Sequence, residues 1–370
     1  MADNPTGPRI RPEVHAGAPY RPGRAATGVD VVKLSSNELP TATTVAAVAA
    51  AAAAGEGANR YPDPTTGALR QALAAHHGLD AAQVSVGAGS VALISEAITA
   101  TSSEGHSVVH GLPSFEAYPQ LVRLAGARSA EVPNDASRLD PNGFVTVANV
   151  EDARLVLIAN PNNPTGTAWR TDEVLSVLNG VASDTMVVLD EAYHEFVTDP
   201  DVPDGVALLA DHPNLVVLRT FSKAWGLAGL RIGYAMGASE VMAALDAVRL
   251  PFSVSAPAQA AALAALGERT AMEAAVASVL AERARLLEGL NAAGWTMPDS
   301  QANFVWFGVG ERAVELGDRL EAAGIIARVF PGVGVRLTVG TAADTDRILA
   351  GLSTPIWGAT AYSPGDMFDG

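Results

Sequence analysis

The strongest constraint on the fold of this 370-residue chain is an alternation of short apolar runs with segments of helical length. The apolar runs are VSVG (84–87), SVVH (107–110), LVLIA (155–159), MVVLD (186–190), LVVLR (215–219) and IGYAM (232–236). Segments long enough for helices lie between most of them, for example 90–101, 114–125 and 171–181. Apolar strands that alternate with helices predict an α/β fold, in which helices cover both faces of a largely parallel sheet.

The length is that of about two domains, and changes in composition divide the chain into four segments. Residues 1–40, with scattered Pro, Gly and Arg, are expected to form an N-terminal arm, and 41–250 a large domain. Residues 251–354 are expected to form a smaller α+β domain. One or two helices at 256–291 are followed there by ANFVWFGV, a helix near 311–323, VRLTVG and a helix near 342–352. Residues 355–370 have turn composition and form a tail.

Charge and composition exclude several classes of function. The net charge of -16 argues against nucleic-acid or anionic-membrane partners. The absence of cysteine excludes disulfides and thiolate chemistry, and the seven histidines show no spacing typical of a metal site, so no metal is expected. The first residues, MADNPTGPRIRPEV, contain no apolar core of signal-peptide length, and no apolar run reaches the length of a membrane span. We therefore expect a cytoplasmic protein.

Lysine is unusually rare in this chain. Of the 24 lysines and arginines only Lys33 and Lys223 are lysines, which leaves 22 arginines. Arginine does not give up its proton, whereas lysine can serve as an amine nucleophile, especially in an apolar pocket. Lys223, within RTFSKAWGLAGLRIGY, is thus open to two interpretations, a surface cation or a reactive amine.

Polar groups that could complete an amine-dependent site follow the predicted strands, where open α/β sheets bind ligands. VGAGSVAL opens a helix after a strand and leaves backbone N–H groups for an anion, although a dinucleotide fingerprint would need a third glycine. NPNNPTG (160–166) is either an ordinary turn or a turn that directs an asparagine amide. Asp190 closes a strand, Tyr193 follows it, and Ser222 and Arg231 flank Lys223.

Taken together, these groups are the set that a pyridoxal-phosphate site requires. The lysine binds the cofactor's aldehyde, and a carboxylate keeps the pyridine nitrogen protonated. A phenol and an amide hydrogen-bond the ring oxygen, and the anion cradle with an arginine holds the phosphate.

The motifs SSNE, RYPDP, NPNNPTG, DEAY, FSKAWGLAGLRIGY and SQANFVWF resemble fold-type I pyridoxal-phosphate aminotransferases. The similarity spans roughly residues 8–352 and is greatest to the branch of histidinol-phosphate and aromatic amino-acid (phenylalanine) aminotransferases. It implies a large domain with a mostly parallel seven-stranded sheet, a smaller α+β C-terminal domain and an N-terminal arm. The segment NELPTATT is shorter than its counterpart in relatives, and the tail has no recognised counterpart.

The resemblance also implies residue roles. Lys223 would bind the cofactor and shuttle the proton, Asp190 would pair with the pyridinium, and Phe115 would stack on the ring. Tyr193 and Asn163 would bond the ring oxygen. The residues implied for the phosphate are Gly89, Ser90, Ser222 and Arg231, with Tyr61 reaching the phosphate of a partner subunit in a homodimer.

On the substrate side, Arg336 would clamp the substrate carboxylate, although an exposed strand arginine would show the same alternation. Tyr20 and the arm around Asn37 would cover the substrate.

The residues beside the expected cofactor favour an aromatic substrate such as phenylalanine or tyrosine, with 2-oxoglutarate as acceptor. Val91 and Ala92 stand where histidinol-phosphate enzymes often carry polar residues, and PFSVS (251–255) resembles the aromatic branch. An apolar lining, extended by Phe115 and Phe252, favours a phenyl or phenol ring. Histidinol phosphate is the alternative substrate. Decarboxylation of an amino-acid phosphate and a non-catalytic binding role are less favoured.

Overall fold

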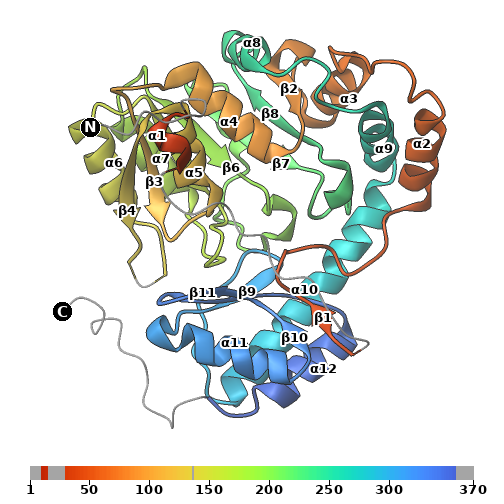
Figure 1. The fold of residues 1–370 in the computed structure, drawn as a ribbon, viewed down its shortest axis with the longest axis vertical. Helices are drawn as coiled ribbons and strands as arrows, with labels where there is room; N and C mark the ends of the chain where they lie inside the picture. Colours follow the sequence, from red (N-terminus) through yellow and green to blue (C-terminus); the bar gives the residue numbers. More distant parts are fainter. Residues whose placement is uncertain (1–9, 16–29, 136, 356–370) are drawn as a thin grey trace, which may run out of the picture.

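The computed structural model describes residues 10–15, 30–135 and 137–355 of the chain. A seven-stranded sheet forms the centre of the larger part of the molecule (Figure 1). In spatial order its strands are β2 (Val84–Gly87), β8 (Gly233–Gly237), β7 (Leu215–Thr220), β6 (Met186–Asp190), β5 (Leu155–Ala159), β3 (Ser107–Leu112) and β4 (Arg128–Pro133). Only β8 runs antiparallel to its neighbours, so the predicted α/β fold with a mostly parallel sheet of seven strands is confirmed.

The six apolar runs of the sequence correspond to six of these strands, and β4 is the seventh. β4 lies at the sheet edge, and its residues alternate between buried and more exposed positions. An edge strand with RSAEVP as its sequence has no continuous apolar run, which is why the sequence pattern did not indicate it.

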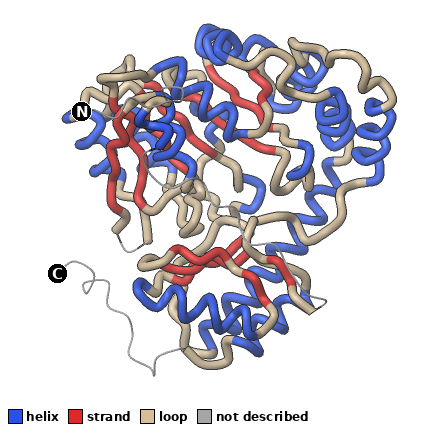
Figure 2. Tube along the Cα trace, in the orientation of Figure 1, coloured by secondary structure: helices blue, strands red, loops and turns tan. Residues whose placement is uncertain are grey.

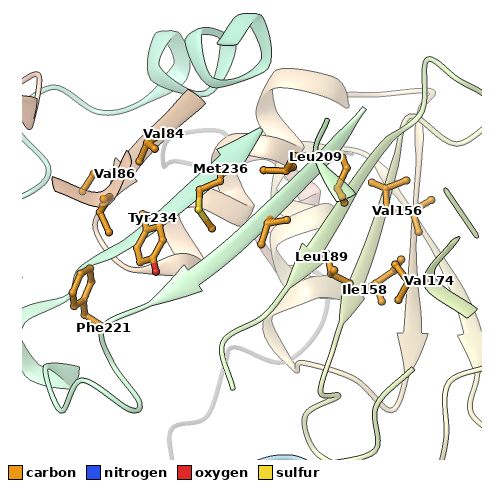
Figure 3. Packing of buried hydrophobic residues seen from close by; sticks show 14 of the residues in the cluster. Val84, Val86, Val156, Ile158, Val174, Leu189, Leu209, Phe221, Tyr234 and Met236 are labelled. Atoms are coloured by element: carbon orange, nitrogen blue, oxygen red, sulfur yellow. The ribbon is translucent and has the colours of Figure 1, made fainter. Parts of the chain in front are cut away.

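Helices cover both faces of the sheet, as the strands' alternation requires (Figure 2). Along β5, Leu155 and Leu157 belong to a buried cluster that includes residues of α4, α5 and α8. Val156 and Ile158 belong to the cluster on the opposite face, which includes residues of α3, α6, α7 and α9. Figure 3 shows part of the cluster that contains Val156, Ile158 and Tyr234. The helices are α2 (Val45–Gly55), α3 (Gly67–His77), α4 (Ser90–Thr101), α5 (Ala117–Ala125), α6 (Pro141–Val150), α7 (Thr171–Gly180), α8 (Ser239–Val248) and α9 (Ala256–Leu266).

Local signals in the sequence set the ends of several helices. The Asp140 side chain caps α6 by accepting from the Asn142 backbone N–H, and Pro141 occupies the first turn. Gly126 ends α5 in the left-handed conformation, at φ 83°.

A second, smaller layer of structure lies below the large sheet in Figure 1. It contains an antiparallel sheet in the order β11–β12–β9, packed on helices α10, α11 and α12. Its elements are β9 (Phe304–Phe307), β11 (Arg328–Phe330), β12 (Gly334–Thr338), α10 (Arg269–Ala292), α11 (Ala313–Ala322) and α12 (Ala342–Gly351). A short parallel pair joins β1 (Val32–Lys33) to β10 (Ile325–Ile326), which brings the N-terminal segment beside this layer.

The remaining helix, α1 (Pro12–His15), lies near α5. Short 3-10 turns occupy Ala81–Gln83, His194–Phe196, Gly205–Leu208, Ala228–Leu230 and Gly310–Arg312. None of the helices in the described ranges combines the length and apolarity needed to cross a membrane.

The predicted domain ranges can be compared with the packing. α9 lies within 251–354, yet its buried alanines join the core of the large sheet, whereas the central and C-terminal residues of α10 belong to the second core. The boundary at 250/251, the 1–40 arm and the 355–370 tail stay predictions.

Candidate active site

A cavity of about 200 Å³ lies at the carboxyl ends of β5, β6 and β7. It faces the three-stranded sheet, whose Arg328 and Arg336 line its far wall. Parallel strands gather the polar groups that follow them at one edge of a sheet. The cavity is therefore bounded by groups from both layers of the molecule.

Lys223 reaches this cavity from the turn that follows β7. Its Nζ donates to the Ser36 backbone oxygen at 3.0 Å and lies 5.9 Å from the centre of the Tyr193 ring. Burial, with the nearby Arg336 charge, lowers the pKa of the amine to about 7. A substantial fraction of the amine is thus neutral, and nucleophilic, near neutral pH.

Asp190 is the last residue of β6 and is buried at the cavity floor. Its carboxylate accepts hydrogen bonds from the Tyr118 hydroxyl at 3.0 Å and from the Ala192 backbone N–H at 3.2 Å. Burial raises the pKa of this carboxyl to about 6, because the hydrogen bonds only partly offset the loss of water. A carboxylate held only by neutral donors would gain from a cationic ring nitrogen.

Tyr193 with Asn37, and Asn163 with Arg336, form two hydrogen-bonded pairs that line the same cavity as Lys223. The Asn37 side-chain amide donates to the Tyr193 hydroxyl at 2.9 Å. Arg336 donates to the side-chain oxygen of Asn163 and, at 2.7 Å, to the backbone oxygen of Ser35. Arg336 is buried, so the alternative of an exposed strand arginine is wrong.

The four residues predicted to hold a phosphate also lie together. Gly89 caps the N-terminus of α4 at φ 86°, and a Cβ there would lie 2.6 Å from Arg231 Nη2. Ser90 begins the helix, and Arg231 Nη1 donates to Ser222 Oγ at 3.2 Å. A helix N-terminus, two hydroxyls and a guanidinium fit a phosphate dianion, and glycine is the residue that lets the arginine approach.

Phe115 lines the cavity, packing edge-to-face on Tyr118 with ring centres 5.4 Å apart. Sequence reasoning missed Tyr118 as the donor to Asp190, although it lies only three residues after Phe115. Arg328 was missed because ARVF carries no motif. Thr220 and Ser36 also line the cavity, and neither was anticipated.

Other expected site residues do not all line this cavity. Tyr61 is 82% exposed and stacks on Phe252 at 4.5 Å between ring centres, outside this cavity. The expected apolar lining needs correction, because Val91 and Phe115 line the cavity while Ala92 and Phe252 do not, and Arg328 adds a cation. Phe252 lies on the surface because its backbone turns there, at φ 59°. Tyr20 lies outside the described residues.

A second polar cluster contains Glu191, His194 and Asp204, whose ligand atoms lie within 4.8 Å of one another. Arg219 donates to both carboxylates, at 2.9 and 2.6 Å. The cluster already holds a cation in the form of this guanidinium, so it carries no metal assignment.

The donor set of the cavity fits pyridoxal phosphate. It combines an amine of lowered pKa, a buried carboxylate of raised pKa, a phenol, an amide and an anion cradle. Each group was predicted from its place after a strand, and the structure brings all of them to one cavity.

Known proteins are similar to this chain in sequence and in fold. The chain matches the family "Aminotransferase class I and II" over residues 29–352. It is 43% identical over 346 residues to an aromatic amino acid aminotransferase of Streptomyces coelicolor, covering 93% of this chain and 96% of that relative. A Thermobifida fusca protein of the same name is 44% identical, with coverage of 92% and 96%.

Among solved structures, histidinol-phosphate aminotransferase from Sinorhizobium meliloti, in complex with pyridoxal-5'-phosphate, superimposes with a TM-score of 0.85. It is 30% identical, and the match covers 93% of this chain and 96% of that one. Aspartate aminotransferase from Thermus thermophilus, at 24% identity and a TM-score of 0.78, shares the fold. The family match over most of the chain and the curated relatives agree: the chain belongs to the class I and II aminotransferases.

Proposed function

We propose that this chain is a pyridoxal-phosphate-dependent aminotransferase that moves the amino group of phenylalanine or tyrosine to 2-oxoglutarate. The observation that carries the reaction class is the pair Lys223 and Asp190, which face one cavity with pKa values displaced to about 7 and about 6. The aromatic substrate rests on the names of relatives that are 43–44% identical and on Val91 and Phe115 in the cavity wall.

The proposed roles follow from the contacts. When bound, the cofactor supplies an electron sink for the bond broken at the substrate's Cα. Lys223 would hold the cofactor covalently and, as a free amine, would carry the proton between the substrate's Cα and the cofactor's C4′, in one direction with the amino donor and in the reverse direction with the acceptor. Asp190 holds the proton on the pyridine nitrogen, and Tyr118 fixes the direction of its carboxylate by the 3.0 Å hydrogen bond.

The remaining groups would orient the ligands. Tyr193 and Asn163 would bond the ring oxygen, exchanging part of their present bonds to Asn37 and Arg336. Gly89, Ser90, Ser222 and Arg231 would hold the phosphate.

Arg336, with its fork of donors toward Asn163 and Ser35, would receive the substrate carboxylate in a bidentate pair.

Histidinol phosphate is the second candidate substrate, and one observation favours it. Arg328 lines the cavity and offers a cation to a phosphate side chain. The Sinorhizobium enzyme that shares this fold at 30% identity bears that substrate in its name.

We further propose a homodimer in the cytoplasm, where amino acids and 2-oxo acids are at hand. Support for the dimer is the exposed stack of Tyr61 on Phe252, together with Val45 and Val48, which stand exposed on α2. In such a dimer Tyr61 would reach the partner's phosphate. Sedimentation should give twice the mass of the chain, and a fully active monomer would refute the proposal.

A half-reaction screen tests the function. Single amino acids and histidinol phosphate are mixed with the holoenzyme, and the absorbance of the bound cofactor is followed. Phenylalanine and tyrosine should convert it faster than histidinol phosphate, and 2-oxoglutarate should restore it. Release of carbon dioxide without any need for an acceptor would instead identify a decarboxylase.

A further inference from the structure

An ion pair between Arg328 and Glu116 joins the small sheet to the large one at the cavity. Arg328 Nε and Nη2 donate to the two carboxylate oxygens of Glu116, at 3.1 and 2.5 Å. The side chains are only 14% and 32% exposed, respectively. This is a bidentate, partly buried pair, the geometry in which arginine binds a carboxylate most strongly.

The two partners come from different layers of the molecule. Arg328 begins β11 in the small sheet, and Glu116 immediately precedes α5 beside the large sheet. Arg328 lines the cavity, and so does Phe115, the residue next to Glu116. The Arg328 guanidinium also lies 5.6 Å from the centre of the Phe330 ring, which helps to fix its plane. The pair thus stands beside the space where a substrate side chain would lie.

A ligand that approaches the charge of Arg328 therefore also meets the charge of Glu116. A phosphate that approached Arg328 would meet the Glu116 carboxylate as well, because both of its oxygens are bonded to the same guanidinium. Either the dianion displaces Glu116 or it lies next to a like charge, and both reduce its affinity. An uncharged ring makes neither demand, since it can pack on Phe115 while the pair stays intact.

We propose that Glu116 determines specificity through Arg328: it biases the cavity against substrates whose side chain ends in a phosphate dianion and toward uncharged aromatic side chains. Glu116 is a positioning residue, because Arg328 and not Glu116 would touch the substrate. This inference rests on the proposed function and explains how a cavity that contains Arg328 can serve an aromatic enzyme.

The test compares Glu116→Gln with the unchanged holoenzyme. Glutamine keeps the size of the side chain and removes its charge. The ratio of kcat/KM for histidinol phosphate to that for phenylalanine should rise at least tenfold, with the gain in KM rather than in kcat. Glu116→Asp, which keeps the charge, should stay within threefold of the original ratio. Glu104→Gln, which removes the same charge at an exposed site, should not change it.

A second pair of measurements separates this inference from the proposed function. The inhibition constants of two unreactive ligands, 3-phenylpropionate and 3-phosphonopropionate, are measured on each holoenzyme variant, by displacement where no turnover is found. Glu116→Gln should favour the phosphonate at least tenfold, and adding Arg328→Gln should abolish that gain. If neither amino substrate reacts, the proposed function fails while the inhibitor ratio still tests Glu116.

The inference is overturned if both ratios change less than twofold in a folded Glu116→Gln variant, or if the gain persists without Arg328. Should Glu116→Gln not fold, Arg328→Gln alone decides. It leaves the Glu116 carboxylate beside the ligand, so the phosphonate should bind at least tenfold more weakly relative to 3-phenylpropionate. An unchanged ratio there would equally overturn the inference.

Discussion

The two walls of the cavity carry different kinds of charge. On the wall formed by the seven-stranded sheet, burial displaces the pKa values of Asp190 and Lys223 toward neutrality. On the opposite wall, the guanidinium groups of Arg328 and Arg336 are fixed by carboxylate, amide and backbone oxygens. With the roles proposed above, the first wall would move protons and hold the cofactor's phosphate, and the second would recognise the anionic groups of the substrate.

The difference follows from how each sheet presents its residues. The ends of β6 and β7 are buried, so Asp190 and Lys223 lose water there, and their hydrogen bonds are to neutral groups, the Tyr118 hydroxyl and the Ser36 backbone oxygen. Arginine cannot respond to burial by losing its proton. A buried arginine therefore needs acceptors, and here the Glu116 carboxylate, the Asn163 amide oxygen and the Ser35 backbone oxygen supply them.

The largest expected effect comes from removing the amine. Lys223→Met should lower kcat by a factor of about 10⁴ or more, because one residue both holds the cofactor and moves the proton. Borohydride reduction of the unchanged holoenzyme followed by peptide mapping should place the cofactor on residue 223. Lys33→Met is the matched control, since the other lysine is paired with Glu38 at 2.9 Å. A label on Lys33 would contradict the assignment of Lys223 as the residue that binds the cofactor.

Asp190→Asn should lower kcat roughly 10³-fold, because an amide cannot hold the pyridine proton by charge. The cofactor-free variant should at the same time be more stable than the original at pH 8. The reason is that the buried carboxylate, with its pKa raised to about 6, opposes folding where it is ionised. Single-turnover kinetics and urea unfolding measure the two effects. Asp211→Asn, at an exposed position, should show neither, and an active Asp190→Asn would mean that another group protonates the ring.

The sequence predicted the first wall better than the second. Lys223, Asp190, Asn163 and the Gly89 segment each follow a strand, and strand ends are visible as the point where an apolar run stops. Because parallel strands end at one edge, position in the sequence is enough to bring these groups together.

The second wall depends on packing that the sequence does not display. Arg328 reaches the cavity only because β11 pairs with β12 and the small sheet packs beneath the large one. Its partner Glu116 lies 212 positions away in sequence. Tyr118 was missed for a related reason, since only the packing of α5 reveals that its hydroxyl reaches Asp190. The sequence pattern did not indicate the edge strand β4, because only two of its six residues, Ala130 and Val132, are buried.

Arg336→Gln should weaken substrate binding about a hundredfold, because truncating one partner of a buried charge pair costs roughly 2–5 kcal/mol. The loss should appear in KM for both the amino acid and the 2-oxo acid, as both present a carboxylate. Arg336→Lys should recover only part of it, since an ammonium cannot make the bidentate pair. Arg269→Gln, which removes a charge from an exposed pair with Glu273, is the control. A change in kcat with KM unaffected would place Arg336 on the proton-moving side of the comparison.

The smallest expected effect is on the stability of the cofactor-free protein, and it isolates the amine of the first wall. The pKa of Lys223 is lowered to about 7 in the folded chain, from its ordinary value of 10.5. Between these values the unfolded chain binds more protons, so this group makes the unfolding free energy rise with pH across that window. From pH 7.5 to 9.5 the contribution is roughly 2 kcal/mol, since a full proton difference changes the free energy by about 1.4 kcal/mol per pH unit. Asp190, whose raised pKa is about 6, is ionised in both the folded and the unfolded state between pH 7.5 and 9.5 and adds no pH dependence.

Urea unfolding of the original protein and of Lys223→Met at the two pH values gives the difference directly, because the other charges of the chain are common to both. Equal pH slopes would show that the buried amine keeps its ordinary pKa, and the contrast between the two walls would then rest on Asp190 alone.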